Sequence, residues 1–141
     1  MRYNDWQTRL EFYVRGLADQ PFVWGVHDCA LFACSAIECI TGVDPGAWFR
    51  GRYTTEAEAT AALLEYAGGG LAATAEKICA ELGFKENAPR FEQRGDVALC
   101  DQGGGDTLGI IDFTGRYVMI ANAKGVVRIP LACVKRSWRV E

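Results

Sequence analysis

Hydrophobic positions follow a helical spacing through the first part of the chain and a strand-like pattern after Pro89. From residue 5 to 18 the apolar positions fall at i, i+4, i+7, i+8 and i+11, which is one face of an amphipathic helix. These positions are Trp6, Leu10, Tyr13, Val14 and Leu17. A helix is therefore expected over residues 5–18, and Pro21 excludes its continuation.

Three more helices are expected before the pattern changes. Residues 29–40 are apolar nearly all round, so this helix should be central and buried, and Gly42 supplies its C-terminal stop. Thr55 and Glu58 form a capping box that begins the third helix. The fourth helix should cover residues 71–82.

Short apolar runs separated by glycine-containing turns follow Pro89. Strands are expected at residues 97–100, 107–113, 117–121, 126–129 and 138–140. Such strands indicate an antiparallel meander or a small barrel. Helices followed by strands predict an α+β fold, and 141 residues, half of them apolar, are enough for one domain over residues 1–141.

Charge and hydropathy exclude several classes of function. The chain has 15 basic and 18 acidic residues, a net charge of -3 and no basic stripe, which argues against nucleic-acid binding. No apolar run approaches the roughly 18 to 20 residues of a membrane span, and the N-terminus lacks the apolar core of a signal peptide. We therefore expect a protein made in the cytoplasm and not exported by the general secretory route.

The six cysteines include no C-x-x-C pair, and the one histidine cannot complete a zinc pattern. Most of the cysteines are interpreted as small buried hydrophobic residues in a reducing compartment. Neither a metal nor a cofactor is expected.

Cys29 is the candidate catalytic residue. It stands in the first turn of the second helix, behind Asp28 as N-cap, and a helix N-terminus favours the thiolate that attacks carbonyls. A nucleophile also needs a base, and His27, two positions earlier, is the only histidine. Two interpretations stay open for each residue. Cys29 is an activated thiol or a small packing residue, and His27 is a substitute base or an ordinary loop histidine.

Several short strings, in this order and spacing, resemble the NlpC-type branch of the papain-like cysteine peptidases over residues 20–130. They are Trp24-Gly25, Asp28-Cys29, Gly42, Arg94-Gly95-Asp96-Val97 and Leu108-Gly109-Ile110. The resemblance implies a papain-like NlpC-type fold in which a helix-borne cysteine faces an antiparallel sheet.

The resemblance also implies where the catalytic partners of Cys29 should be. The family histidine precedes the apolar-Gly-Ile triplet, where this chain has Thr107, and an orienting polar residue would fall near Met119 to Ala121. Neither position matches the family. A threonine hydroxyl does not titrate near neutrality, so Thr107 cannot take the thiol proton as imidazole does. Losing one member of a catalytic triad typically costs several orders of magnitude in rate.

Three further strings are similar to a narrower group of small phage-encoded tail-region proteins, which also lack the strand histidine. They are Gly42-Val43-Asp44-Pro45, Arg50-Gly51-Arg52-Tyr53 and Trp138-Arg139. This similarity implies a virion component of the tail tip or baseplate, made in the host cytoplasm and present in several symmetric copies. Its expected partners are tail hub or baseplate proteins.

Two enzymatic alternatives remain. The chain could be an active cysteine peptidase or amidase that cleaves peptidoglycan peptides during phage entry, or a thiol acyltransferase on the same fold. Both chemistries need a base beside Cys29.

The candidate partner-binding residues are Trp48, Phe49, Arg50 and Arg52. Aromatic residues and arginine are enriched where protein interfaces are strongest, which favours a docking segment here. The alternative is that the two arginines are surface residues without a function.

Overall fold

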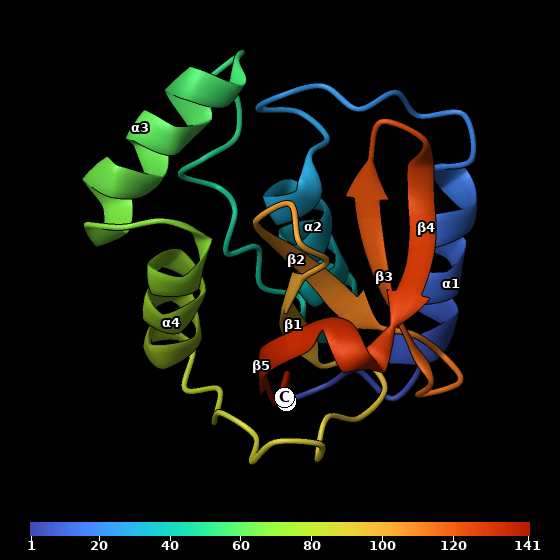
Figure 1. Ribbon diagram of the computed structural model, residues 1–141. Helices are drawn as coiled ribbons and strands as arrows, with labels where there is room; N and C mark the ends of the chain where they lie inside the picture. Colours follow the sequence, from blue (N-terminus) through green and yellow to red (C-terminus); the bar gives the residue numbers. More distant parts are fainter.

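The computed structural model describes all 141 residues and contains four α-helices and five β-strands (Figure 1). The helices are α1 (Trp6–Gly16), α2 (Cys29–Thr41), α3 (Glu56–Ala67) and α4 (Leu71–Glu81). The helices precede the strands along the chain, so the expected α+β class is confirmed. None of the four helices has the length and apolarity needed to span a bilayer.

The strands form one antiparallel sheet in the order β4-β3-β2-β1-β5. They are β1 (Val97–Asp101), β2 (Asp106–Ile111), β3 (Tyr117–Asn122), β4 (Gly125–Pro130) and β5 (Val134–Trp138). The first four strands make the expected meander, and a 3-10 turn (Leu131–Cys133) then leads into β5, which returns to pair with β1. The prediction of a last strand at residues 138–140 is wrong, because β5 begins at Val134.

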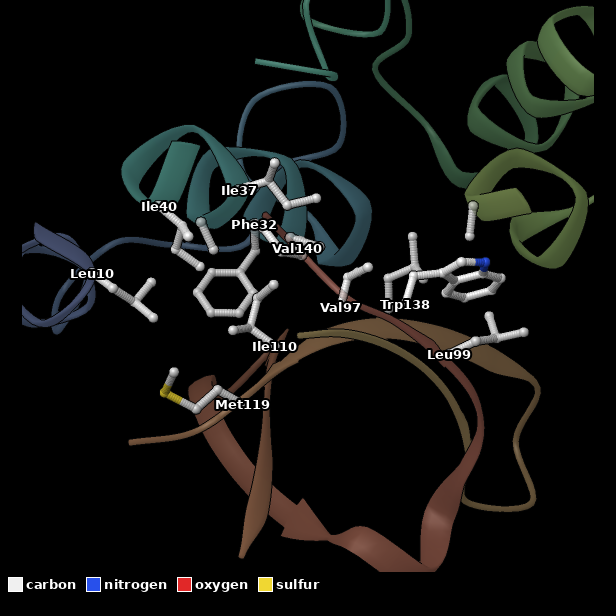
Figure 2. Close-up of a cluster of buried hydrophobic side chains, with 14 of the residues drawn as sticks. Leu10, Phe32, Ile37, Ile40, Val97, Leu99, Ile110, Met119, Trp138 and Val140 are labelled. Carbon is white, nitrogen blue, oxygen red and sulfur yellow. The ribbon is translucent and has the colours of Figure 1, made fainter. Parts of the chain in front are cut away.

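The main core lies between the sheet and α2, with α1 packed against α2. In Figure 2, Phe32, Ile37 and Ile40 of α2 extend toward the sheet, which contributes Ile110 and Met119. All five side chains are at most 2% exposed. The apolar character of α2 therefore reflects its central position.

The opposite face of the sheet is also buried, because the sheet curves strongly (Figure 2). A second, smaller core fills this concave face. Its members are Ala98, Cys100, Ile111, Val118, Ile120 and Ile129. Burial on both faces explains why β1 is apolar at four successive positions instead of alternating.

The α3–α4 hairpin lies on one side of α2, away from α1 (Figure 1). A third apolar cluster, which includes Leu31 of α2, joins the hairpin to the rest of the molecule. Its buried members are Leu31, Phe49, Tyr53, Ala59, Ala62 and Ile78. The segment between α2 and α3 therefore supplies part of the packing that positions the hairpin.

The predicted helix ends are confirmed by their hydrogen bonds. Gly42 ends α2 in the left-handed conformation (φ 84°), and its N–H donates to the Glu38 carbonyl at 2.7 Å. The Thr55 hydroxyl accepts from the Glu58 N–H at 3.1 Å. The Glu58 carboxylate accepts from the N–H of Thr54 instead of that of Thr55. The second hydrogen bond of the capping box is therefore shifted by one residue.

Asp96, just before β1, is completely buried and joins both ends of the chain. Its carboxylate accepts hydrogen bonds from Arg2 Nη2 at 2.9 Å, Asn87 Nδ2 at 3.0 Å and Arg139 Nε at 3.3 Å. The backbone N–H of Gln93 adds a donor at 2.9 Å. A buried carboxylate is tolerated only when donors and opposite charges surround it in this way.

The Asp96→Asn variant should lose about 3 kcal/mol of unfolding free energy, because it leaves two arginines without their shared counter-charge. Both arginines are partly exposed, which puts the expected loss at the lower end for a broken buried pair. Urea denaturation followed by circular dichroism measures the difference. Asp19→Asn, at an exposed position without an ion pair, is the matched control and should stay within about 0.5 kcal/mol of the wild type. Equal stability of the two variants would contradict the role given to Asp96.

Candidate functional site

Asp28 sets the position of Cys29 at the start of α2. The Asp28 carboxylate is 1% exposed and caps the helix by accepting from the Leu31 N–H at 2.9 Å. Its second oxygen accepts from the Gly25 N–H at 3.0 Å and from the Tyr53 hydroxyl at 2.7 Å. Three donors from three places in the chain therefore fix the residue next to the thiol.

Gly25 is required by close packing against the chain near Tyr53. Its φ is +81°, and a Cβ placed on it would lie 2.0 Å from the Tyr53 carbonyl oxygen. The Gly25 carbonyl in turn accepts from the Gly51 N–H at 2.8 Å. The Trp24-Gly25 string thus marks the point where the loop before α2 contacts the segment before α3.

The structure brings Cys29 and Thr107 together, as the resemblance predicts. Burial raises the pKa of the Cys29 thiol above its ordinary value, while the nearby Thr107 hydroxyl and the Leu108 N–H act to lower it. The adjacent Asp28 carboxylate raises this pKa further. The net direction is upward, so the thiol is held protonated at neutral pH despite its place at a helix N-terminus.

A groove of about 330 Å³ opens beside Cys29, between the start of α2, the α3–α4 hairpin and the start of β2. Trp24, Leu63 and Leu71 supply apolar surface, and Glu56 and Asp106 supply acidic groups. No lysine, arginine or histidine is among the residues that line the groove. No imidazole therefore lies in the groove, and the ionisable groups that share its lining with the thiol are the carboxyl groups.

His27 does not lie at this groove. It is 5% exposed, and its ring packs edge-on against Phe32 with 6.4 Å between the ring centroids. Burial lowers the pKa of the imidazole below its ordinary value, although the Asp28 charge acts in the opposite direction. The backbone of His27 forms a bridge with Val23, which holds the loop in this arrangement. His27 is therefore a packed residue of the loop before α2, and nothing in the geometry supports it as the base.

The second family position also lacks a polar partner. The segment from Met119 to Ala121 lies in β3, and its side chains are at most 3% exposed. Met119 and Ala121 belong to the main core, whereas Ile120 belongs to the core on the concave face. None of the three carries a group that could orient a histidine.

The predicted docking segment requires a correction, because Phe49 is not available to a partner. Phe49 is 3% exposed and packs within the third cluster against Tyr66, with ring centroids 4.8 Å apart. Trp48 is half-buried and contacts both of these rings. Much of the aromatic surface attributed to an interface is therefore used inside the molecule.

The two arginines of this segment are also bound internally. Arg50 holds the Asp44 carboxylate through Nε at 2.9 Å and Nη2 at 3.1 Å, and it donates to the Ser35 hydroxyl at 2.9 Å. The Arg52 guanidinium lies 3.8 Å from the centre of the Trp48 ring and donates to the Trp48 carbonyl. Both arginines therefore stabilise the segment that connects α2 to α3.

Tyr53 is the site residue that sequence reasoning missed. Its hydroxyl reaches Asp28 across 25 positions of the chain. Burial, together with the hydrogen bond to Asp28, raises the pKa of Tyr53, so its hydroxyl remains a donor to the carboxylate. An acidic N-cap in an apolar environment is the sequence signal for such a residue. The start of the helix uses only part of the hydrogen-bond accepting capacity of the carboxylate, so another donor is expected nearby.

No three His, Cys, Asp or Glu side chains come together in an arrangement that could hold a metal ion. Comparison with family models matches residues 1–140 to the domain of unknown function DUF6950. A search among curated proteins finds no match.

The alkylation rate of Cys29 should be low at pH 7 and should keep rising above pH 9, because the thiol pKa is raised above its ordinary 9.0. Site-resolved mass spectrometry after timed exposure to iodoacetamide separates Cys29 from the other five cysteines. Thr107→Val removes a group that lowers the pKa and should slow the reaction at a given pH. A rate that reaches its plateau below pH 8 would contradict the protonated thiol.

Proposed function

The chain belongs to the DUF6950 family, and we propose that it is a virion component of a phage tail tip or baseplate. In this proposal it has a papain-like NlpC-type fold without efficient hydrolase activity, and it acts by docking to tail hub proteins. It is made in the host cytoplasm, resides in the virion tail and is present there in several symmetric copies.

One observation carries the proposal, which is the pairing of Cys29 with Thr107 where the NlpC-type peptidases have a histidine. A hydroxyl is too weak a base to accept a thiol proton near neutrality. The thiol pKa is raised instead of lowered, which is unfavourable for a nucleophile. The site therefore has a cysteine at the position of the family nucleophile and a threonine at the position of the family histidine.

The fold is compatible with this proposal at two further points. The Asp28-Cys29 helix start packs against an antiparallel sheet that follows it in the chain, which is the order of the resembled peptidases. Gly25 and Asp96, two residues of the resembling strings, occupy positions with strict steric or hydrogen-bonding requirements. The requirements of the fold therefore explain the presence of these two residues without any catalytic role.

The docking part of the proposal needs a surface other than the one favoured by the sequence. Replacing Trp48 and Arg50 would disturb the connection between α2 and α3, because both residues hold it together. A loss of particle binding in such a variant would not distinguish docking from folding. Purified virions provide the direct test, since mass spectrometry should find several copies of the chain in intact tails. Its absence from virions would overturn the tail assignment.

The alternative is an active cysteine peptidase or amidase that cleaves peptidoglycan peptides. The groove beside Cys29 favours it, because a substrate could reach the thiol there. A thiol acyltransferase would use the same groove and would need the same missing base.

Turnover measurements separate the proposal from these alternatives. The wild type should release no product from peptidoglycan fragments, and Cys29→Ala should behave identically and remain folded. His27→Ala is the control for a substitute base. Turnover that Cys29→Ala abolishes would establish an active enzyme and overturn the proposal, and its loss in His27→Ala as well would identify His27 as the base.

Restoring the family histidine tests the resemblance itself. Thr107→His places an imidazole beside the thiol, and an imidazolium partner lowers a thiol pKa. We expect alkylation of Cys29 at pH 7 to accelerate by about tenfold or more over the wild type. Thr107→Val is the size-matched comparison and should show no acceleration. Equal rates in both variants would argue against an NlpC-type geometry.

A further inference from the structure

β5 begins beside β1 (Figure 1), and two of the six cysteines meet there. Cys100 of β1 pairs with Val134 of β5, and Cys133 directly precedes Val134. Residues directly opposite in an antiparallel pair have Cα atoms about 5 Å apart, so a residue one step along the chain lies about 6 Å away. Disulfide-bonded cysteines usually have Cα atoms about 4.4 to 6.8 Å apart. The backbone therefore places Cys100 and Cys133 within the range of a disulfide.

A shift of register and a short turn bring the two side chains to the same face of the sheet. At Cys100 the pairing skips Lys135, so Cys100 faces Val134 and comes one residue closer to Cys133. A regular strand would direct residues 133 and 134 to opposite faces, but the 3-10 turn before β5 interrupts this alternation. Cys133 and Val134 both pack against the core on the concave face, to which Cys100 belongs.

The two thiols differ in their access to solvent. Cys133 is half-buried, whereas Cys100 is completely buried. Burial, with a further contribution from the neighbouring Cys133, raises the pKa of the Cys100 thiol to about 12. A small oxidant can therefore reach Cys133 first, and Cys100 can react only with a group that is already held beside it.

The other four cysteines have no comparable partner. Cys29, Cys34 and Cys39 stand five positions apart on α2, which separates neighbouring Cα atoms by about 8 to 9 Å and exceeds the reach of a disulfide. Cys34 and Cys79 are at most 4% exposed, so neither is open to an oxidant in solution. The folded chain therefore favours one bridge over all other pairings.

We propose that Cys100 and Cys133 form a site of reversible oxidation, at which a low-molecular-weight disulfide of the glutathione class converts the two thiols into an intramolecular disulfide. First, the Cys133 sulfur attacks one sulfur of the oxidant, which forms a mixed disulfide and releases one small thiol that carries the Cys133 proton. The Cys100 sulfur then attacks the Cys133 sulfur, and a second small thiol leaves with the Cys100 proton. The two cysteines together lose two electrons, and the oxidant is reduced to two thiols.

The bridge would join β1 to the start of β5, which is an edge strand of the sheet. It closes a loop that contains β2, β3 and β4, since the two cysteines are 33 positions apart. Closing a loop of this length restricts the unfolded chain and stabilises the folded one. The thiols persist in a reducing compartment, and the bridge forms where small disulfides prevail. This inference is independent of the proposed function, because Cys29 is on α2, which packs against the opposite face of the sheet.

Oxidation of the full chain with excess oxidised glutathione tests the proposal. After the remaining thiols are blocked, mass spectrometry of proteolytic fragments should find the Cys100–Cys133 disulfide as the main intramolecular bridge of the folded wild type. The same treatment in urea should give a mixture of pairings, which shows that the fold selects the pair. The bridged protein should unfold at a temperature higher by about 5 °C or more, and dithiothreitol should reverse this shift.

Single variants separate the two steps. Cys100→Ala removes the thiol that completes the bridge, so a glutathione adduct should accumulate on Cys133. Cys133→Ala should leave Cys100 reduced, because no oxidant reaches it directly. Cys39→Ala, at another half-buried cysteine, is the matched control and should form the bridge like the wild type. Circular dichroism verifies that each variant is folded.

Three results would overturn the proposal. They are a folded wild type that forms no Cys100–Cys133 bridge, a wild type whose main bridge joins another pair, and a folded Cys100→Ala variant that carries no adduct on Cys133. The wild-type measurements decide the matter even where a variant fails to fold.

Discussion

Buried carboxylates must find hydrogen-bond donors, and this requirement governs how distant parts of the chain meet. Asp96 is inaccessible to water, and its donors come from residues near both termini and from the segment before β1. The segment before α1 and the residues after β5 therefore meet at one buried carboxylate. The same contacts hold the end of β5, which pairs with β1 at the edge of the sheet. A single acidic side chain thus joins the segment before α1 to the end of β5.

Asp28 applies the same constraint to the candidate site. Its carboxylate is satisfied by its own helix start, by Gly25 and by Tyr53, and these contacts hold the loop before α2 against the segment before α3. Cys29 is consequently fixed in place, but it is partly buried and lies beside the negative charge of Asp28. Both conditions favour the neutral thiol, and they outweigh the field at the helix N-terminus. Position alone does not activate a cysteine, and the partner opposite to it decides the chemistry.

Local patterns predicted the elements that local interactions determine. The helix ends at Thr55 and Gly42 depend on hydrogen bonds within four residues, so the sequence shows them directly. The last strand was misplaced because its pairing with β1 is non-local and shifts register at Lys135, which interrupts the alternation. Arg136 is held there by Glu86, 50 residues earlier in the chain, and no short window contains that partner. The pairing of Cys29 with Thr107 was predictable only through the resemblance, since no spacing rule relates a helix start to a strand start 78 positions later.

The contrast between Phe49 and Phe12 shows why composition alone does not identify a binding surface. An aromatic pair beside two arginines has the composition of an interface, yet the same residues satisfy one another across the connection between α2 and α3. A lone phenylalanine on the polar side of a helix has no such signature, and its exposure emerges only after the inner face of α1 has been packed. Arginine and tryptophan find partners readily inside a domain, because a guanidinium can bind a carboxylate and cover a ring. Exposure alone does not identify a binding surface either, because single apolar side chains are common on the surface of folded proteins.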